Sequence, residues 1–337
     1  MTATRMIDLS LLPPPDVVEM LDFEALLVTR KAQYLSSYPV AEQPAIAARL
    51  ALKSDPVTKL LEESTYRELV LRQRVNDAAK ASLLAYATGA DLENRAADYG
   101  VQKLTLRPAD PDAVPPVPAV MESDEDLRYR TRLSLEALSS AGSRGAYEFH
   151  GLSASASIAS VSVDSPRFSG VPVPAAVAAQ LPAGAIVLVC DYDAGLANPL
   201  PGDVSLAVLP RLDSQEQPEE LVNMVHKNLS DESVRPVTDR PRAQLGQPVS
   251  FEVQATLELE AGPEPSVVQA ASRTSLDKAI AAARDLEGQL SLSAVYAALH
   301  VQGVRRVDLK KPTADITCDK RHFPNCTSIS LSTKVVG

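Results

Sequence analysis

The chain has 337 residues, of which 45% are hydrophobic, and this is typical of a globular protein with two or three domains. It carries 33 basic and 43 acidic residues, so a net charge of -10 argues against general binding to nucleic acid or to an anionic membrane. Trp is absent and aromatic residues make up 4%, which argues against carbohydrate-binding and base-stacking surfaces. No apolar run approaches the roughly 20 residues of a membrane span and no secretory signal is present, so we expect a soluble protein made in the cytoplasm.

Helical patterns fill the first third of the chain. Residues 6–12 form a short apolar arm that three prolines end, residues 22–35 form a helix capped by an aspartate, and residues 46–52 form a short second helix. The longest helical region opens with a second capping aspartate and runs over residues 55–89 without an internal Gly or a Pro beyond its first turn. A last short helix lies between glycines, over residues 89–100.

The long helical region carries an apolar stripe with two polar interruptions. Its spacing places six candidate interface residues near one face: Leu61, Leu69, Leu83, Tyr86, Arg72 and Asn76. Unpaired polar groups cost roughly 1 to 3 kcal/mol when buried. Either Arg72 and Asn76 therefore have dedicated partners, or they mark an exposed polar gap in a bundle helix.

A Pro-rich stretch over residues 105–121 predicts an extended linker. The helix that follows begins with Ser123 and three acids, as a capped helix does, and Arg128 and Arg132 lie close enough to pair with those acids or with another chain. The Gly-Ser-Arg-Gly sequence at 142–145 follows a helix and lacks the lysine of a phosphate loop. We interpret it as a turn between helices, in preference to an anion site.

The middle of the chain alternates strands and helices around an irregular stretch. That stretch, residues 166–200, is rich in Pro and small residues, and its apolar run 185–190 is compatible with a buried strand. A strand over 202–209 and a helix over 219–229 follow. Arg235 and Asp239 next invite a catalytic interpretation, but we favour a braced turn because no His or nucleophile stands at a meaningful spacing.

The last third reads strand, helix, helix, strand, strand. Residues 249–260 alternate, which predicts a sheet with one buried face made of Phe251, Val253, Ala255, Leu257 and Leu259. Arg305 and Arg306, basic residues in an acidic chain, are candidates for a further interface to a partner. Cys318, His322 and Cys326 lack an evident fourth ligand, so we expect unpaired thiols and no metal or other cofactor.

Four ordered stretches resemble the J-class baseplate proteins of contractile phage tails and tail-derived bacteriocins. They are RQRVNDAAKASLLAYATGADLENRAADYGV, the ESDEDLR start with the GSRGAYEFH turn, LSDESVRPVTD, and YAALHVQGVRRVDLKKPTADI. The resemblance as a whole covers roughly residues 55–316. The J-class pattern passes from a Ser-Pro turn almost directly to a glycine and a strand, so the resemblance implies an inserted loop or hairpin at about 166–200.

The resemblance implies a structural role in the baseplate wedge of a contractile tail. In this family two copies join one I-class partner through a helical bundle, and neighbouring wedges join into a ring that rearranges to trigger sheath contraction. The expected partners are therefore a second copy of the chain, an I-class wedge protein, neighbouring wedges, and baseplate hub or sheath-proximal proteins. The expected location is a virion or bacteriocin particle assembled in the host bacterial cytoplasm.

The predicted fold is α+β and multidomain, with an N-terminal helical bundle segment followed by two small α/β domains with mixed sheets. We expect an arm and helical region over 1–104, the linker over 105–121, a middle domain over 122–245 and a C-terminal domain over 246–337. A hydrolase using Asp124 with Glu148 or Arg235 is the alternative function, but these carboxylates sit among other acids near a helix start. A receptor-binding fibre would call for repeats, which are absent.

Overall fold

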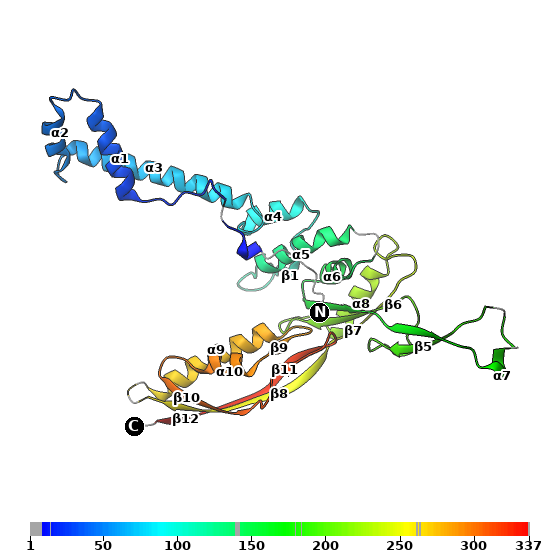
Figure 1. Ribbon diagram of the computed structural model, residues 1–337. Helices are drawn as coiled ribbons and strands as arrows, with labels where there is room; N and C mark the ends of the chain where they lie inside the picture. The colour runs from blue at the N-terminus through cyan, green and yellow to red at the C-terminus, as the bar shows by residue number, and fades with distance from the viewer. Residues whose placement is uncertain are drawn as a thin grey trace. The chain divides into compact units, whose positions relative to one another are not determined.

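A computed structural model of the chain describes residues 9–13, 15–138, 142–178, 180–182, 184–260, 262 and 264–335. Its contacts divide the chain into two compact units (Figure 1). Unit 1 comprises Met1–Gln102 and Ser123–Thr131, and unit 2 comprises Lys103–Glu122 and Arg132–Gly337. Helices and several small mixed sheets make up the described residues, so the predicted multidomain α+β class is confirmed. The finer domain boundaries given above stay a prediction.

All the described secondary-structure elements of unit 1 are helices. Its elements are η1 (Leu9–Leu11), α1 (Phe23–Ser36), α2 (Gln43–Leu50), α3 (Pro56–Ala81), α4 (Gly89–Ala97) and the start of α5 (Asp124–Ala137). The predicted capping aspartates are confirmed. The Asp22 carboxylate accepts the Glu24 N–H at 2.8 Å at the start of α1, and the Asp55 carboxylate accepts the Val57 N–H at 2.9 Å at the start of α3.

The long helix ends earlier than its sequence predicts. It stops at Ala81, eight residues before Gly89, although neither Gly nor Pro interrupts it there. The guanidinium group of Arg128 donates to the carbonyl oxygens of Leu84 at 2.9 Å and Ala87 at 2.6 Å in the turn that follows. In a longer α3 these carbonyl oxygens would accept backbone hydrogen bonds of the helix. Hydrogen bonds from Arg128 of α5 replace those bonds.

Unit 2 opens with a hairpin in the Pro-rich segment, where we expected an extended linker. Strand β1 (Thr105–Arg107) pairs antiparallel with β2 (Val120–Met121), and Asp110 bridges Val117 between them. The N–H of Leu104 donates to the Glu122 carboxylate at 2.8 Å. The segment is thus extended, as its prolines dictate, but it folds back on itself.

A three-stranded sheet forms the middle of unit 2, with strand order β3-β6-β7. Its elements are β3 (Ile158–Asp164), β6 (Asp203–Pro210), β7 (Arg240–Leu245), and the helices α6 (Arg144–Leu152) and α8 (Pro218–Leu229) that contact it. Strands β6 and β7 are parallel, and Asp203 at the start of β6 is fully buried between Arg240 at 2.7 Å and Arg242 at 3.3 Å. Burial raises the pKa of Asp203, but the Leu200 N–H and the two guanidinium groups outweigh burial and hold that pKa below its ordinary value.

Between β3 and β6 the chain contains a hairpin that is not part of this sheet. Strand β4 (Arg167–Val171) pairs antiparallel with β5 (Val187–Tyr192), and the short helix α7 (Ala175–Ala178) lies between them in sequence. The prediction that 185–190 form a buried strand is wrong, because five of the six β5 residues are exposed. A continuous apolar run indicates that burial would stabilise the strand, but it does not indicate that residues of the same chain bury it.

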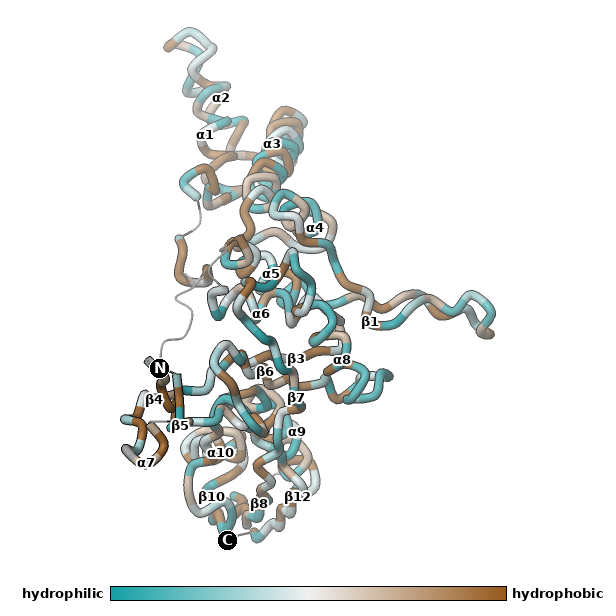
Figure 2. Tube along the Cα trace, turned by 90° about the vertical axis from the view of Figure 1, so that its right-hand side faces the viewer, coloured by the Kyte–Doolittle hydropathy of each residue, from teal (hydrophilic) through white to brown (hydrophobic). Residues whose placement is uncertain are grey.

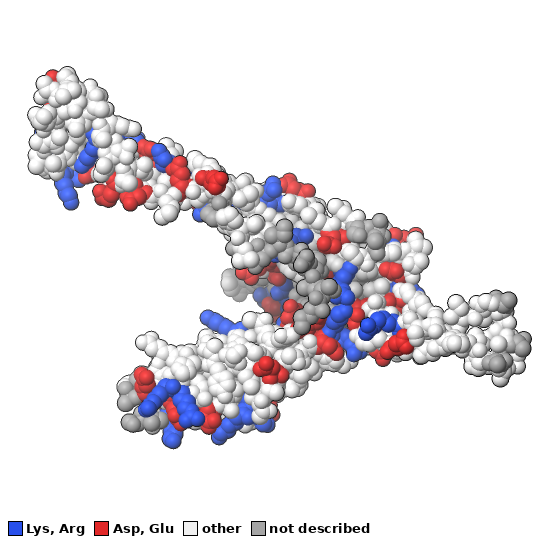
Figure 3. Space-filling view, in the orientation of Figure 1, with Lys and Arg blue, Asp and Glu red and all other residues white. Residues whose placement is uncertain are grey.

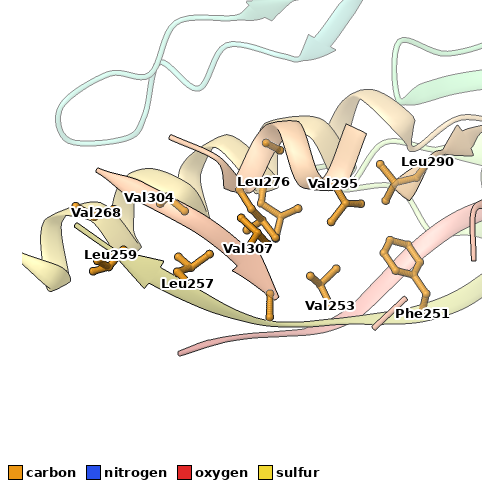
Figure 4. Close-up of a cluster of buried hydrophobic side chains, with 13 residues drawn as sticks. Phe251, Val253, Leu257, Leu259, Val268, Leu276, Leu290, Val295, Val304 and Val307 are labelled. Carbon is orange, nitrogen blue, oxygen red and sulfur yellow. The ribbon is translucent and has the colours of Figure 1, made fainter. Parts of the chain in front are cut away.

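The C-terminal sheet has the order β10-β8-β12 and a single helical layer over one face (Figure 4). Its elements are β8 (Gln247–Leu259), β10 (Val304–Lys311), β12 (His322–Val335), the helices α9 (Pro265–Ala283) and α10 (Leu292–Leu299), and the small pair β9 (Gln289–Leu290) and β11 (Ile316–Thr317). All five predicted inward residues of β8 are buried, from Phe251 to Leu259. The alternation in 249–260 therefore predicted this face correctly.

Leu257→Asp is expected to lower the stability of unit 2 by about 3 kcal/mol or more, because a carboxylate would be buried without a partner. Leu257 is 0% exposed in the cluster with Leu276 and Val307. Urea unfolding followed by circular dichroism measures the loss. Ser330→Asp, at an exposed position of the neighbouring strand β12, is the control and should unfold close to the parent.

Candidate partner interfaces

The two polar residues of the predicted interface stripe are paired within the chain. Asn76 is 4% exposed, and its side-chain oxygen accepts the Glu19 N–H at 3.0 Å while its amide donates to the Glu19 carbonyl at 2.9 Å. Arg72 forms ion pairs with Glu19 at 2.7 Å and Glu68 at 2.8 Å. Both therefore fasten the segment that precedes α1 (residues 15–22, here the arm), and their polarity no longer indicates a second chain.

The four apolar residues of the same stripe follow the intramolecular side of the helical region. Leu61, Leu69 and Tyr86 are half-buried, and Leu83, in the turn after α3, is 37% exposed. The Tyr86 hydroxyl donates to the Leu12 carbonyl at 2.9 Å. Helices α1 and α2 contact α3, so this stripe largely serves packing inside unit 1.

A second apolar face of α3 is uncovered. Leu60 is 65% exposed, Leu71 64% and Val75 55%, and at 3.6 residues per turn the three lie within about 60° of one another around the helix. The buried Thr65 and Asn76 lie about a third of a turn away. None of these three apolar residues is among the predicted interface residues, although their spacing of eleven and four is itself a helical signal.

The two candidate arginines of α5 have different surroundings. Arg128 uses its guanidinium group on the backbone of the turn after α3, as described above, so it serves unit 1 itself. Arg132 is half-buried and lies in the part of α5 that belongs to unit 2. Neither therefore presents a fully exposed cation for another chain.

The turn after α8 is braced rather than arranged for catalysis. Arg235 donates to the backbone carbonyl of Asp239 at 2.8 Å, and the Asp239 carboxylate accepts the Tyr147 hydroxyl at 2.7 Å. Burial raises the pKa of Tyr147, and the bond to Asp239 raises it further. Gly142 has a φ of 66° against this turn, where an added Cβ would come within 2.7 Å of Pro236 Cγ. The GSRG sequence thus serves a close approach between segments.

The acids of the alternative enzymatic interpretation lie in separate units. The Asp124 carboxylate accepts the Gly89 N–H at 2.7 Å at the start of α4, and Glu148 is half-buried on α6 of unit 2. Cys318 and Cys326 are free thiols, and His322 Nδ1 lies 2.5 Å from Asp319 Oδ1. Across the described ranges, no three His, Cys, Asp or Glu side chains are grouped as ligands for a metal ion.

Arg305 and Arg306 lie on β10, an edge strand of the C-terminal sheet, and both are exposed. Within the part of the chain that the structure describes, neither forms an ion pair, whereas Lys311 on the same strand lies 3.0 Å from Glu252. Basic and acidic side chains are interspersed over this sheet (Figure 3). The two arginines are thus available for contact with another molecule.

Asn76→Leu is expected to release the arm from α3, because the Glu19 N–H and carbonyl would each lose a partner. A loss of about 1.4 kcal/mol in local stability would make the Glu19 amide exchange with solvent about tenfold faster. Hydrogen exchange read by mass spectrometry measures this. Asn94→Leu is the control, since Asn94 bonds only to Ala90 on its own helix, and it should leave Glu19 unchanged.

These features define a class: a structural subunit with apolar and charged surfaces directed outward, whose candidate catalytic groups are engaged in structural contacts. No helix in the described residues has the length and apolarity needed to cross a membrane. Sequence comparison agrees with this class. Residues 53–110 match the Baseplate J-like N-terminal domain, and residues 251–332 match the Baseplate J-like protein C-terminal domain.

Similarity to a known relative covers nearly the whole chain. The sequence is 43% identical over 327 residues to Baseplate protein J of Escherichia phage P2, and the match covers 97% of each chain. The chain therefore belongs to the baseplate J family, as the resemblance of its motifs predicted. Membership gives it a structural role in a phage-tail baseplate, in contact with other baseplate proteins.

Proposed function

We propose that the chain is a subunit of the baseplate wedge of a contractile tail, which joins a second copy of itself and an I-class partner through helix α3. The uncovered face of α3 carries this proposal. An apolar stripe on a helix that already packs against α1 on another side needs a further helix to cover it. Permanent interfaces are the more hydrophobic ones, so this face suits contacts that persist within a wedge.

The proposed wedge interface lies about a third of a turn around α3 from the stripe that contains Leu61, Leu69 and Asn76. Leu60, Leu71 and Val75 become its centre. Asn76 and Arg72 are left to hold the arm. The arm and α1 then set the position of α3 without occupying the face that a partner needs.

The C-terminal sheet suits the second kind of contact, between neighbouring wedges. A ring that rearranges when the tail is triggered needs an interface weak enough to be broken and remade. Contacts between exposed charges are weak and are screened by salt. Arg305 and Arg306, exposed and free of internal ion pairs among the described residues, provide such contacts to an acidic neighbour. Hub and sheath-proximal proteins are further partners under this proposal.

We propose no enzymatic activity. The carboxylate of Asp124 is engaged at a helix start and Arg235 braces a turn, so the residues of the hydrolase alternative have structural contacts. The proposal also includes domain boundaries at residues 104, 121 and 245. It further includes assembly of the chain in the host cytoplasm before incorporation into a particle. The family matches at 53–110 and 251–332 fall within the outer two of these domains apart from a few residues of the linker.

Leu71→Asp is expected to abolish wedge formation, because it places a charge at the centre of the apolar face of α3. The full chain would be co-expressed with its I-class partner, and the complex recovered by a tag on that partner. Leu52→Asp, 57% exposed in unit 1 but outside α3, is the control and should be recovered at the parent level. Recovery of the Leu71→Asp complex at that level contradicts the assignment.

Arg305→Glu combined with Arg306→Glu should leave the wedge intact and impair ring closure. The reversal of charge removes attraction to an acidic neighbour but leaves α3 untouched. Electron microscopy of co-expressed baseplates counts closed rings, and Lys334→Glu, an exposed change on the opposite edge strand, is the comparison. If the arginine pair blocks wedge formation instead, the two interfaces have been assigned in the wrong order.

A further inference from the structure

The β4–β5 hairpin contains a long uncharged stretch in a charged protein. Residues 168–190 include no Asp, Glu, Lys, Arg or His, whereas 23% of the whole chain is charged. In Figure 3 the projecting hairpin shows almost no blue or red, and in Figure 2 its strands are largely brown. This stretch is the part of unit 2 that charge does not protect from association.

The apolar residues of this stretch are open to solvent. Ile186 is 73% exposed, Leu188 51% and Val189 45%. Among the described strands, β4 and β5 pair only with each other, so each has an outer edge that no other strand of this chain covers. Soluble proteins usually blunt such an edge with charge or proline, because its free N–H and C=O groups bind other strands.

The two edges of the hairpin differ in what they can accept. Neither strand contains a proline, but Pro166 directly precedes β4 and Pro172 directly follows it. Since a proline has no N–H to donate, a strand added to the outer edge of β4 could bond to no more than its five residues. The prolines nearest β5 are Pro182 and Pro199, and its Val-Leu-Val-Cys sequence has high β-propensity. The outer edge of β5 is therefore the edge better suited to adding a strand.

The base of the hairpin is held in place. The Arg167 guanidinium stacks over the Tyr192 ring at 4.9 Å, and the Tyr192 hydroxyl donates to the Asp164 carboxylate at 2.6 Å. Lys320 also donates to Asp164, at 2.8 Å. Burial raises the pKa of Asp164, but its bonds to Lys320 and Tyr192 outweigh burial and lower that pKa below its ordinary value. An edge held this way loses less conformational freedom on binding than a free loop.

We propose that the outer edge of β5 pairs antiparallel with β5 of a second copy of this chain, forming a four-stranded sheet across a two-fold axis. Each copy carries a net charge of -10, so two copies repel one another except where their surfaces carry no charge, as along this hairpin. One usable edge per copy closes the assembly at two, whereas two usable edges would build a fibre.

The inference rests on the proposed function in taking a second copy as a partner, but it uses a surface in unit 2 instead of α3. The test therefore uses the full chain carrying Leu71→Asp, which removes association through the α3 face. Sedimentation over a range of concentrations should still show a dimer. Adding Leu188→Lys should weaken that dimer at least tenfold, because two lysines would approach each other across the axis.

Leu212→Lys is the matched control, since Leu212 is 80% exposed in the same unit but outside the hairpin, and it should leave the dimer unchanged. Leu188 is itself exposed, so both variants should melt like the parent. The exposed thiol of Cys190 gives a second measurement. Antiparallel pairing centred within two residues of Cys190 places the two cysteines within about 14 Å of each other, which a bifunctional maleimide spans.

The reagent should produce a covalent dimer of the Leu71→Asp chain that Cys190→Ser abolishes. A monomer at every concentration, or a dimer that Leu188→Lys does not weaken, overturns the proposal. So does a cross-link from Cys190 to a different protein in assembled baseplates, which would make the edge a site for another partner. If Leu71→Asp fails to block the wedge while Leu188→Lys still weakens the dimer, the α3 assignment is wrong and the β5 pairing stands.

Discussion

Strand β8 is the element on which most of unit 2 depends. It pairs with β10 on one side and β12 on the other, and its inward residues from Phe251 to Leu259 form the floor of the C-terminal core. It begins two residues after β7 ends, separated only by Gly246, whose N–H donates to the Val208 carbonyl of the middle sheet. Leu286 and Phe323 pack beside Ala207 and Leu209 at this junction. One chain segment thus connects both sheets, and the alternation of its side chains decides which face is covered.

Helix α3 serves the fold of unit 1 on one face and, under the proposed function, an assembly on another. Its internal face combines the half-buried Leu61 and Leu69 with Asn76, which satisfies both backbone groups of Glu19, while further apolar side chains are exposed on another face. A buried polar contact is specific, so it positions the arm, and an exposed apolar stripe is non-directional, so it gains most when another helix covers it. The same division recurs in the hairpin, where Asp164 and Tyr192 fasten the base and the apolar strand is left open.

The exposed apolar face of α3 and the exposed arginines of β10 are consistent with the role of a baseplate subunit. A permanent contact favours apolar area and a releasable one favours charge, and under the proposed function the chain carries the two on different elements, α3 and β10. Family membership places the chain in the tail baseplate, and the uncovered stripes give a physical reason why it works there as one part among several. Under that proposal, one contact can break while the other holds, because the two lie on different elements.

Local pattern alone determined a large part of this protein. The caps at Asp22 and Asp55, the inward face of β8 and the family motifs could all be read from sequence, because each depends on neighbouring residues or on a fixed period. The end of α3 at Ala81 could not, since the guanidinium group that replaces its ladder comes from Arg128, far along the chain. The exposure of β5 could not be predicted either. An apolar run indicates that the strand is stabilised by burial, but it does not indicate whether the same chain or a partner buries it. Only the tertiary structure shows which apolar faces the chain has already used, and therefore which remain for a partner.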